Sequence, residues 1–183
     1  MNRSTLDRLI SSTGLIIALV LLAASGALFY AHSFIHTQVH NQLAAEKITF
    51  PAAGSKGLMA LPADDQAQVA KYAGQQLLTG AQAKVFADNY IAVHLQKVGG
   101  GKTYSELSSA SIADPTNTAL VGQVQTMFRG ETLRGLLLNA YAFDTMAMVA
   151  NLAALGALAA SALLFILSAL GFYHSGRVKN KRK

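Results

Sequence analysis

The chain contains no cysteine. Disulfide bonds, thiolate metal sites, thiol catalysis and iron–sulfur clusters are therefore excluded, and packing must stabilise any folded part. Charge is scarce as well. Asp, Glu, Lys and Arg make up only 13% of the residues, and the two apolar runs from Leu9 to Tyr30 and from Thr145 to Tyr173 contain none of them. Because a membrane-spanning helix needs roughly 20 apolar residues, each run is long enough to cross a bilayer.

The net charge of +6 lies entirely outside these two runs, because the segment between them holds eight basic and eight acidic residues. Basic residues flank membrane spans on the cytoplasmic side. We therefore expect a multi-pass protein of the cell membrane with both termini in the cytoplasm. Its predicted parts are a cytoplasmic N-terminus (1–8), a first transmembrane helix (9–31), an extracytoplasmic domain (32–144), a second transmembrane helix (145–173) and a basic cytoplasmic tail (174–183).

The first run has an alternative interpretation as a cleaved signal peptide, because Ser25-Gly26-Ala27 supplies small residues where cleavage would occur. Its apolar character continues through Ile35, however, and no proline appears before Pro51, so we favour an uncleaved anchor. The excess positive charge lies beside the bilayer. The isoelectric point of 9.7 therefore indicates contact with anionic lipid headgroups, and nucleic acid is not an expected partner.

Apolar residues recur at helical spacing throughout the middle segment, and no strand-like alternation of useful length occurs. We expect the first span to continue as a helix to about residue 47. A loop should follow at 48–62, then helices over about 64–80, 81–98 and 103–113, and a last helix that runs into the second span. The predicted fold class is an all-α membrane protein, whose two transmembrane helices continue into a small extracytoplasmic helical bundle.

Local signals mark several helix ends. Thr103 and Glu106 have the spacing of a capping box, and Gly99-Gly100-Gly101 is typical of a helix C-terminus. Asp114-Pro115 predicts a break. The segment from Gly99 to Thr103 resembles the end of a phosphate-binding loop, but Gln96 stands where that motif requires glycine. We therefore interpret this segment as a cap and a turn.

Small residues in the spans predict that the two helices approach each other closely. Ala153, Ala157 and Ser161 recur every four residues in the second span, and Gly14 and Ala18 repeat that spacing in the first. Small residues let helix backbones come together in lipid. The same face suits an intramolecular pair, a helix of a partner protein, or a second copy of this chain.

Three histidines, His32, His36 and His40, follow one another at every fourth position and lie on one face of the first helix. An i, i+4 pair can bind one metal ion, so His36 and His40 are the candidate ligands, with His32 as a further candidate. The outer two are about 12 Å apart along the axis and cannot share an ion. A third ligand would come from elsewhere, with His94, Glu46 and Glu131 available. Two alternatives remain open, namely a row of interfacial imidazoles and a stripe that protonates near pH 6.

Two arginines flank a carboxylate at Arg129, Glu131 and Arg134. One interpretation is a surface ion pair between Glu131 and Arg134, worth a few tenths of a kcal/mol. The other is a contact with anionic headgroups or with a partner, because arginine binds phosphate and carboxylate through two hydrogen bonds.

Nothing in the chain resembles a nucleophile with its base. The serines lie at helix starts and in runs of small residues, and no Gly-x-Ser-x-Gly turn exists. Asp64 and Asp65 suit the first turn of a helix, where negative side chains interact with the helix dipole. We therefore expect no enzyme activity, and no cofactor is predicted.

Four segments resemble a family of actinobacterial two-span membrane proteins: YAGQQ at 72–76, YIAVHL at 90–95, GKTY at 101–104 and FRGETLRGLLLNAY at 128–141. The likeness extends over nearly the whole chain. This family has no established activity. Its members are sometimes labelled aromatic-ring-opening dioxygenases, a chemistry that needs two histidines and a carboxylate on iron. His36 and His40 supply two such ligands at most, so no catalytic residue is carried over.

These features together predict a non-enzymatic integral membrane protein, acting as an accessory or scaffold subunit of a cell-envelope complex. Its expected partners are the lipid bilayer and either another membrane protein or further copies of itself. The alternative is an extracytoplasmic module that binds a ligand, a lipid or a metal and reports through a partner, because the short cytoplasmic ends leave no room for an output domain.

Overall fold

The computed structural model describes residues 3–180 and is all-helical over that range, with 83% helix and no strand. Residues 181–183 of the predicted basic tail lie outside the described residues. Two of the helices, α1 and α7, are long and apolar enough to cross a membrane. The elements in chain order are α1 (Arg3–Glu46), α2 (Lys56–Met59), α3 (Ala63–Ala70), α4 (Gly80–Val85), the π-helix η1 (Phe86–Ile91), α5 (Ala92–Gly99), α6 (Tyr104–Ala113) and α7 (Thr118–Asn180).

The chain divides into two compact units. The helix-pair unit consists of Met1–Phe34 and Met146–Lys183, and the multi-helix unit consists of Ile35–Thr145. Helices α1 and α7 each contribute residues to both units. The bounds of the multi-helix unit are close to the limits 32–144 predicted for the extracytoplasmic domain, whose location outside the cell stays a prediction.

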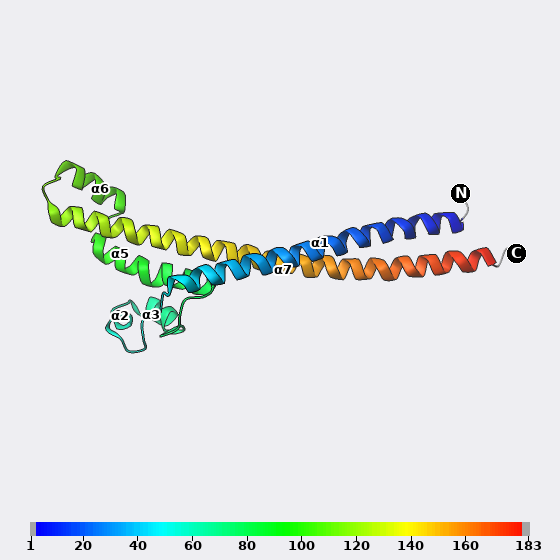
Figure 1. The fold of residues 1–183 in the computed structure, drawn as a ribbon, viewed down its shortest axis with the longest axis horizontal. Helices are drawn as coiled ribbons and strands as arrows, with labels where there is room; N and C mark the ends of the chain where they lie inside the picture. The colour runs from blue at the N-terminus through cyan, green and yellow to red at the C-terminus, as the bar shows by residue number, and fades with distance from the viewer. Residues whose placement is uncertain (1–2, 181–183) are drawn as a thin grey trace. The chain divides into compact units, whose positions relative to one another are not determined.

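In the helix-pair unit, α1 and α7 lie side by side, with the start of α1 and the end of α7 at the same end of the pair (Figure 1). The buried residues along their contact recur every seven positions, which is typical of a left-handed helix pair. The predicted four-residue series of the second span is wrong at Ala153, which is exposed, although its last member, Ser161, is buried in the seam. The residues of this seam, all small, are Ser11, Ala18 and Ser25 on α1 and Ala147, Ala154, Ser161, Ser168 and Ser175 on α7.

Serines connect the two helices across this seam. Ser25 Oγ donates a hydrogen bond to the carbonyl oxygen of Ala154 at 2.9 Å, and Ser161 Oγ donates to that of Ala18 at 2.8 Å. Such interhelical bonds in a membrane contribute about 0.6 kcal/mol each.

Two glycines allow the helices to approach this closely. A Cβ atom at Gly171 would lie 2.1 Å from Ser11 Oγ, and one at Gly14 would lie 2.7 Å from Ser168 Oγ. Each helix therefore sets a serine against a glycine of the other. Of the three alternatives for this face, the structure shows the intramolecular pair, with Gly14 and Ala18 against α7.

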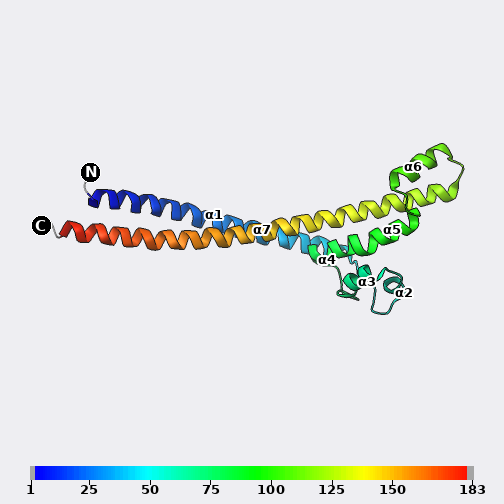
Figure 2. The same ribbon diagram turned by 180° about the vertical axis from the view of Figure 1, so that it is seen from behind.

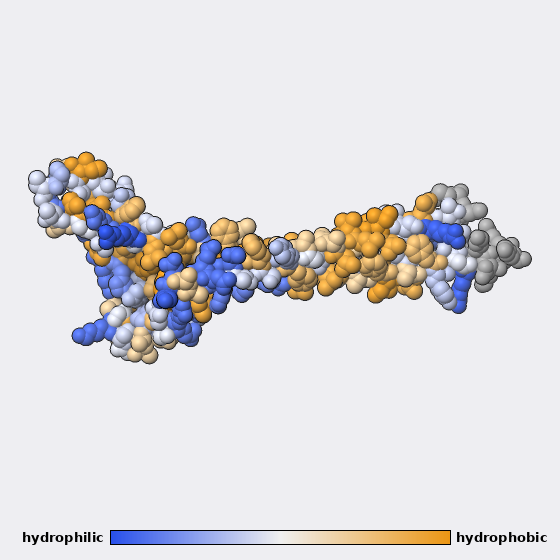
Figure 3. All heavy atoms as spheres, viewed as in Figure 1, coloured by the Kyte–Doolittle hydropathy of each residue, from blue (hydrophilic) through white to orange (hydrophobic). Residues whose placement is uncertain are grey.

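The outer surface of the helix pair is apolar (Figure 3). Ile16 is 63% exposed and Leu152 is 68% exposed, and most other large aliphatic residues of this unit are exposed as well. A monomeric soluble protein rarely exposes a continuous apolar surface of more than a few hundred Å². This surface is suited to a hydrocarbon solvent.

The multi-helix unit has a conventional hydrophobic core. Phe50 is 2% exposed, and its ring packs edge-on against Phe86, with ring centroids 5.2 Å apart, and against Tyr72 at 5.3 Å. Aromatic contacts of this geometry stabilise beyond the area they bury. Leu58, Leu61, Val69, Leu77 and Ile91 complete the centre of this core.

The helix predicted over 64–80 is wrong in its second half. Helix α3 ends at Ala70, and Gly74 adopts a left-handed conformation with φ of +72°. Residues 75–77 then run beside residues 48–50, which follow α1. Two hydrogen bonds join the segments: Phe50 N–H donates to the Gln75 carbonyl at 2.9 Å, and Leu77 N–H donates to the Ile48 carbonyl at 2.8 Å. These bonds and the complete burial of Leu77 outweigh the helical preference of the sequence.

The helix predicted over 81–98 is present, but it is interrupted by six residues of π-helix. Segments α4, η1 and α5 follow one another from Gly80 to Gly99 and lie along α7 (Figure 2). The Thr103–Glu106 capping box and the left-handed cap at Gly100 (φ +59°) are confirmed, as is the break after Ala113. Helix α7 passes through Gly130 without interruption, and the Leu95 side chain packs against this glycine. A Cβ there would lie 2.3 Å from Leu95 Cδ2.

Candidate functional site

One buried carboxylate joins three helices of the multi-helix unit. Asp144 of α7 is 9% exposed. Its Oδ1 atom lies 2.9 Å from Nδ1 of His36 on α1, and its Oδ2 accepts a hydrogen bond from the backbone N–H of Gly80 at 3.1 Å. The latter bond satisfies one of the free donors at the start of α4. Asp144 was not singled out from the sequence, although it is the last acidic residue before the second apolar run.

Gly80 is required at this junction for steric reasons. A Cβ atom there would lie 2.4 Å from Cβ of Asp144 and 3.0 Å from Cα of Tyr141. Two further donors at the start of α4, the N–H groups of Thr79 and Gln82, are satisfied by the Thr79–Gln82 capping box. The geometry is that of a rigid junction, in which the carboxylate orients the His36 ring.

The other histidines of the predicted stripe have different surroundings. In the helix-pair unit, Nδ1 of His32 lies 2.9 Å from the carbonyl oxygen of Ala147. His40 is exposed, and Nδ1 of His94 lies 2.8 Å from the carbonyl oxygen of Tyr90. Among residues 3–180, no three His, Cys, Asp or Glu side chains are grouped so that they could hold one metal ion. Neither His94 nor any candidate carboxylate completes a group of three, and metal binding by His36 and His40 stays a prediction.

The predicted cluster of Arg129, Glu131 and Arg134 is divided in the structure. Arg134 lies 3.3 Å from a carboxylate oxygen of Asp88 on η1 and 3.5 Å from one of Glu131. Asp88 also accepts a hydrogen bond from Lys84 at 2.6 Å. Arg134 therefore belongs to an ion-pair network that connects α7 to α4 and η1.

The pKa values within this network are shifted. Burial alone would raise the pKa of Asp88, but the hydrogen bonds and charges of Lys84 and Arg134 outweigh burial and lower it below the ordinary value of 3.8. The hydrogen bond to Asp88, together with its charge, raises the pKa of Lys84. Both shifts favour the ionised pair at neutral pH.

A groove runs between α1 and α7 within the multi-helix unit, with a volume of about 400 Å³. Leu136 and Phe143 on its α7 side are 61% and 54% exposed, and Leu133 is 38% exposed. Three polar residues, Gln42, Glu46 and Asn139, also line it, and its apolar lining consists of Val39, Leu43, Ile48, Leu133, Leu136, Leu137, Ala140 and Phe143. The gathering of exposed apolar side chains in one hollow makes this groove a candidate binding surface.

A second hollow, which we call the aromatic–arginine site, lies between α6 and α7, with a volume of about 470 Å³. The rings of Tyr104 and Phe128 are 5.9 Å apart here, and Phe128 is 56% exposed. Arg129 lies beside them, with Val124 and Gln125. The sequence indicated Arg129 but not its pairing with Tyr104, because Tyr104 is 25 residues away and only the fold brings it close.

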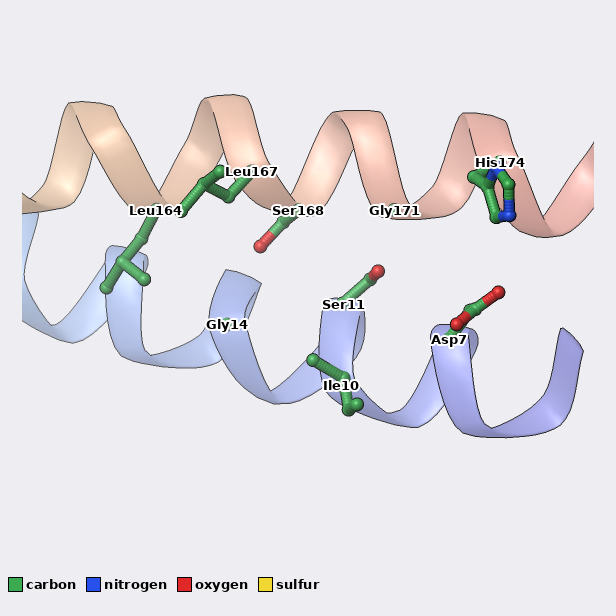
Figure 4. A pocket seen from close by; sticks show the side chains of 9 residues that line it. All are labelled: Asp7, Ile10, Ser11, Gly14, Leu164, Leu167, Ser168, Gly171 and His174. Carbon is green, nitrogen blue, oxygen red and sulfur yellow. The ribbon is translucent and has the colours of Figure 1, made fainter. Parts of the chain in front are cut away.

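A cavity of about 350 Å³ lies between α1 and α7 in the helix-pair unit (Figure 4). Asp7 and His174 point toward each other across it, with Ser11 and Ser168 further along. Oδ2 of Asp7 is buried and has no hydrogen-bond partner among the described residues. Burying an ionisable carboxylate inside an apolar helix pair costs free energy. Asp7 lies just before the apolar run of α1, at the end of the pair where charged residues begin.

Comparison with models of protein families, with curated proteins and with solved structures finds no match for this chain.

Proposed function

We propose that this protein is a non-enzymatic membrane protein, an accessory or scaffold subunit of a cell-envelope complex, and that the groove between α1 and α7 receives a helix of another subunit. The exposed apolar lining of that groove carries the proposal, since Leu136 and Phe143 are more than half exposed and lie together in one hollow, whereas the exposed Ile112 is outside it. In this arrangement the helix-pair unit spans the membrane, both termini are cytoplasmic and the multi-helix unit lies outside.

The form of the groove favours a helix as its occupant. Both of its long walls are helices, and ridges and grooves of neighbouring helices interlock. Along α7 the lining residues Leu133, Leu136, Ala140 and Phe143 are spaced by three or four positions, which is the pattern that faces a partner helix. The ten-residue distance from Leu133 to Phe143 corresponds to about 15 Å, or nearly three helical turns.

The surface of the helix-pair unit supports the membrane assignment. Its seam is made of small residues and its outer face of large aliphatic ones, an arrangement suited to lipid because small residues pack helices closely where no hydrophobic force acts between them. Basic residues at both chain ends support a cytoplasmic location for them. The resemblance to a two-span membrane family agrees with this organisation.

The test is purification of the full chain in mild detergent, followed by mass spectrometry of the intact complex. We expect a stoichiometric partner, or a homo-oligomer, that Leu136→Gln removes. The matched control is Ile112→Gln, because Ile112 on α6 is also apolar and is 78% exposed, but it does not line the groove. If the native protein were recovered alone, or with a bound lipid in place of a partner, the subunit proposal would be wrong and the binding-module alternative would replace it.

A further inference from the structure

We propose that the aromatic–arginine site, formed by Tyr104, Phe128 and Arg129, is a second contact for the partner protein and binds an acidic segment of it. A carboxylate of that segment pairs with Arg129, and an adjacent apolar side chain covers Phe128. This inference rests on the proposed function, because it assigns to the same partner a contact separate from the groove.

The two arginines of the multi-helix unit differ in a way that points to an external anion. Arg134 is already engaged by Asp88 and Glu131. Arg129 is exposed, and among the described residues it has no ion-pair partner within 4 Å. On α6, the carboxylate of Glu106 is occupied by the Thr103 cap, whose backbone N–H and hydroxyl lie 2.7 and 2.8 Å from it. An unpaired guanidinium presents two parallel donors suited to a carboxylate.

The rings beside Arg129 supply the apolar part of the contact. Phe128 is 56% exposed and Tyr104 is 38% exposed, although both rings belong to one aromatic pair. Aromatic residues and arginine are the residue types enriched where protein interfaces concentrate their binding energy. Gln125, in the lining of the same hollow, can bond to a peptide backbone, since its amide has both donors and an acceptor.

The position of the site along α7 favours a protein segment over a lipid headgroup. Sixteen residues separate Arg129 from Thr145, the last residue of this unit, which corresponds to about 24 Å of helix. The headgroup layer on each side of a bilayer is only about 5 to 8 Å thick. In the proposed arrangement, in which the membrane span begins at about Thr145, this length of helix exceeds the headgroup layer, which favours an occupant that itself extends from the membrane.

The experiment is site-specific photocrosslinking in cells that express the full chain. Phe128 is replaced by p-benzoylphenylalanine, which keeps an aromatic ring at the site, and the crosslinked peptide is identified by mass spectrometry. We expect a peptide that contains Asp or Glu near the crosslinked residue. In the same background, Arg129→Gln should lower the crosslinking yield by about tenfold, whereas Arg129→Lys retains the charge and should keep at least about a third of it. Arg129 is exposed, so neither substitution disturbs the core.

A second crosslinker at Leu136, in the groove, separates the two proposals. Crosslinks from both positions to one partner support both. Four outcomes would each overturn the aromatic–arginine site while leaving the groove proposal intact. They are a crosslink from position 136 alone, a yield at position 128 that Arg129→Gln leaves unchanged, a crosslinked lipid, and a crosslinked peptide without an acidic residue. No crosslink at either position would overturn both proposals, and a crosslink at 128 alone would overturn the groove.

Discussion

The two units of this protein bury opposite kinds of side chain. The seam of the helix-pair unit consists of serine and alanine, and its isoleucines and leucines are exposed. The multi-helix unit buries phenylalanine, leucine and valine, and its charged residues are mostly at the surface. Large apolar side chains leave water when a domain folds, so they form its core. In lipid that driving force is absent, and close contact between small residues takes its place.

The difference predicts that the multi-helix unit depends on the volume of its core residues, whereas the helix-pair unit depends on the smallness of its seam. Substitutions that remove volume should harm the first unit and those that add volume should harm the second. The predictions below test this contrast, in order of decreasing effect.

The largest expected effect is that of Phe50→Ala. Phe50 is almost completely buried and contacts both Phe86 and Tyr72, so its removal leaves a cavity and should lower the free energy of unfolding of the multi-helix unit by about 3 to 5 kcal/mol. Urea unfolding of the detergent-solubilised chain, followed by aromatic circular dichroism, measures this. Met59→Ala is the control, because Met59 is 60% exposed, and it should change stability by less than about 0.5 kcal/mol.

An intermediate effect is expected when volume is added to the seam. Gly171→Leu forces a side chain into the space that Ser11 Oγ occupies, and the free energy that holds the helix pair together should fall by about 1 to 3 kcal/mol. Titration of the chain with a denaturing detergent, followed by circular dichroism, reports this loss. At Gly156 of the same helix a Cβ atom would meet nothing within 4 Å, so Gly156→Leu should be nearly neutral. Equal effects at both positions would contradict the seven-residue seam.

The smallest expected effect concerns the ion pairs around Asp88. Because its pKa is lower in the folded protein than the ordinary 3.8, the ionised carboxylate stabilises the fold. That contribution is complete above pH 3.8 and is lost as the pH falls through the folded pKa. Asp88→Asn should therefore lower the free energy of unfolding by about 1 kcal/mol or less at neutral pH, since the group is partly exposed and screened.

The pH dependence is the decisive measurement for Asp88. Stability of the native protein and of Asp88→Asn, compared by urea unfolding from neutral pH downward, should converge as Asp88 becomes protonated. A gap that stayed constant down to about pH 2 would mean that packing, and not the charge, is what the substitution removes.

Much of the helical organisation was predictable from local sequence. The capping box at Thr103, the glycine cap at Gly100 and the break before Thr118 depend on residues close together in the chain, and all were confirmed. The end of α3 at Ala70 was missed because it depends on hydrogen bonds from 75–77 to 48–50, which no local pattern reveals. The π-helix within Gly80–Gly99 was also missed.

The candidate sites were only partly predictable. His36 and Arg129 were indicated by their own spacing, but each has a neighbour from another helix. Asp144 is 108 residues from His36, and Tyr104 is 25 residues from Arg129. The groove was missed as a site, since Leu133, Leu136 and Phe143 have the helical spacing of an ordinary buried face. Exposure distinguishes a core stripe from a binding surface, and exposure is a property of the fold.

The sequence by itself determined the all-helical class and the two helices able to cross a membrane, because helix propensity, caps and long uncharged runs are local properties. Only the tertiary structure decided which faces those helices present. It placed serine against glycine along the helix pair and buried Asp144 in contact with His36 and Gly80. It paired Arg134 with Asp88 and Glu131 but left Arg129 exposed, and it left the apolar groove between α1 and α7 open to solvent. These outcomes depend on which residues distant in the chain meet, and that is settled by packing over the whole of each unit.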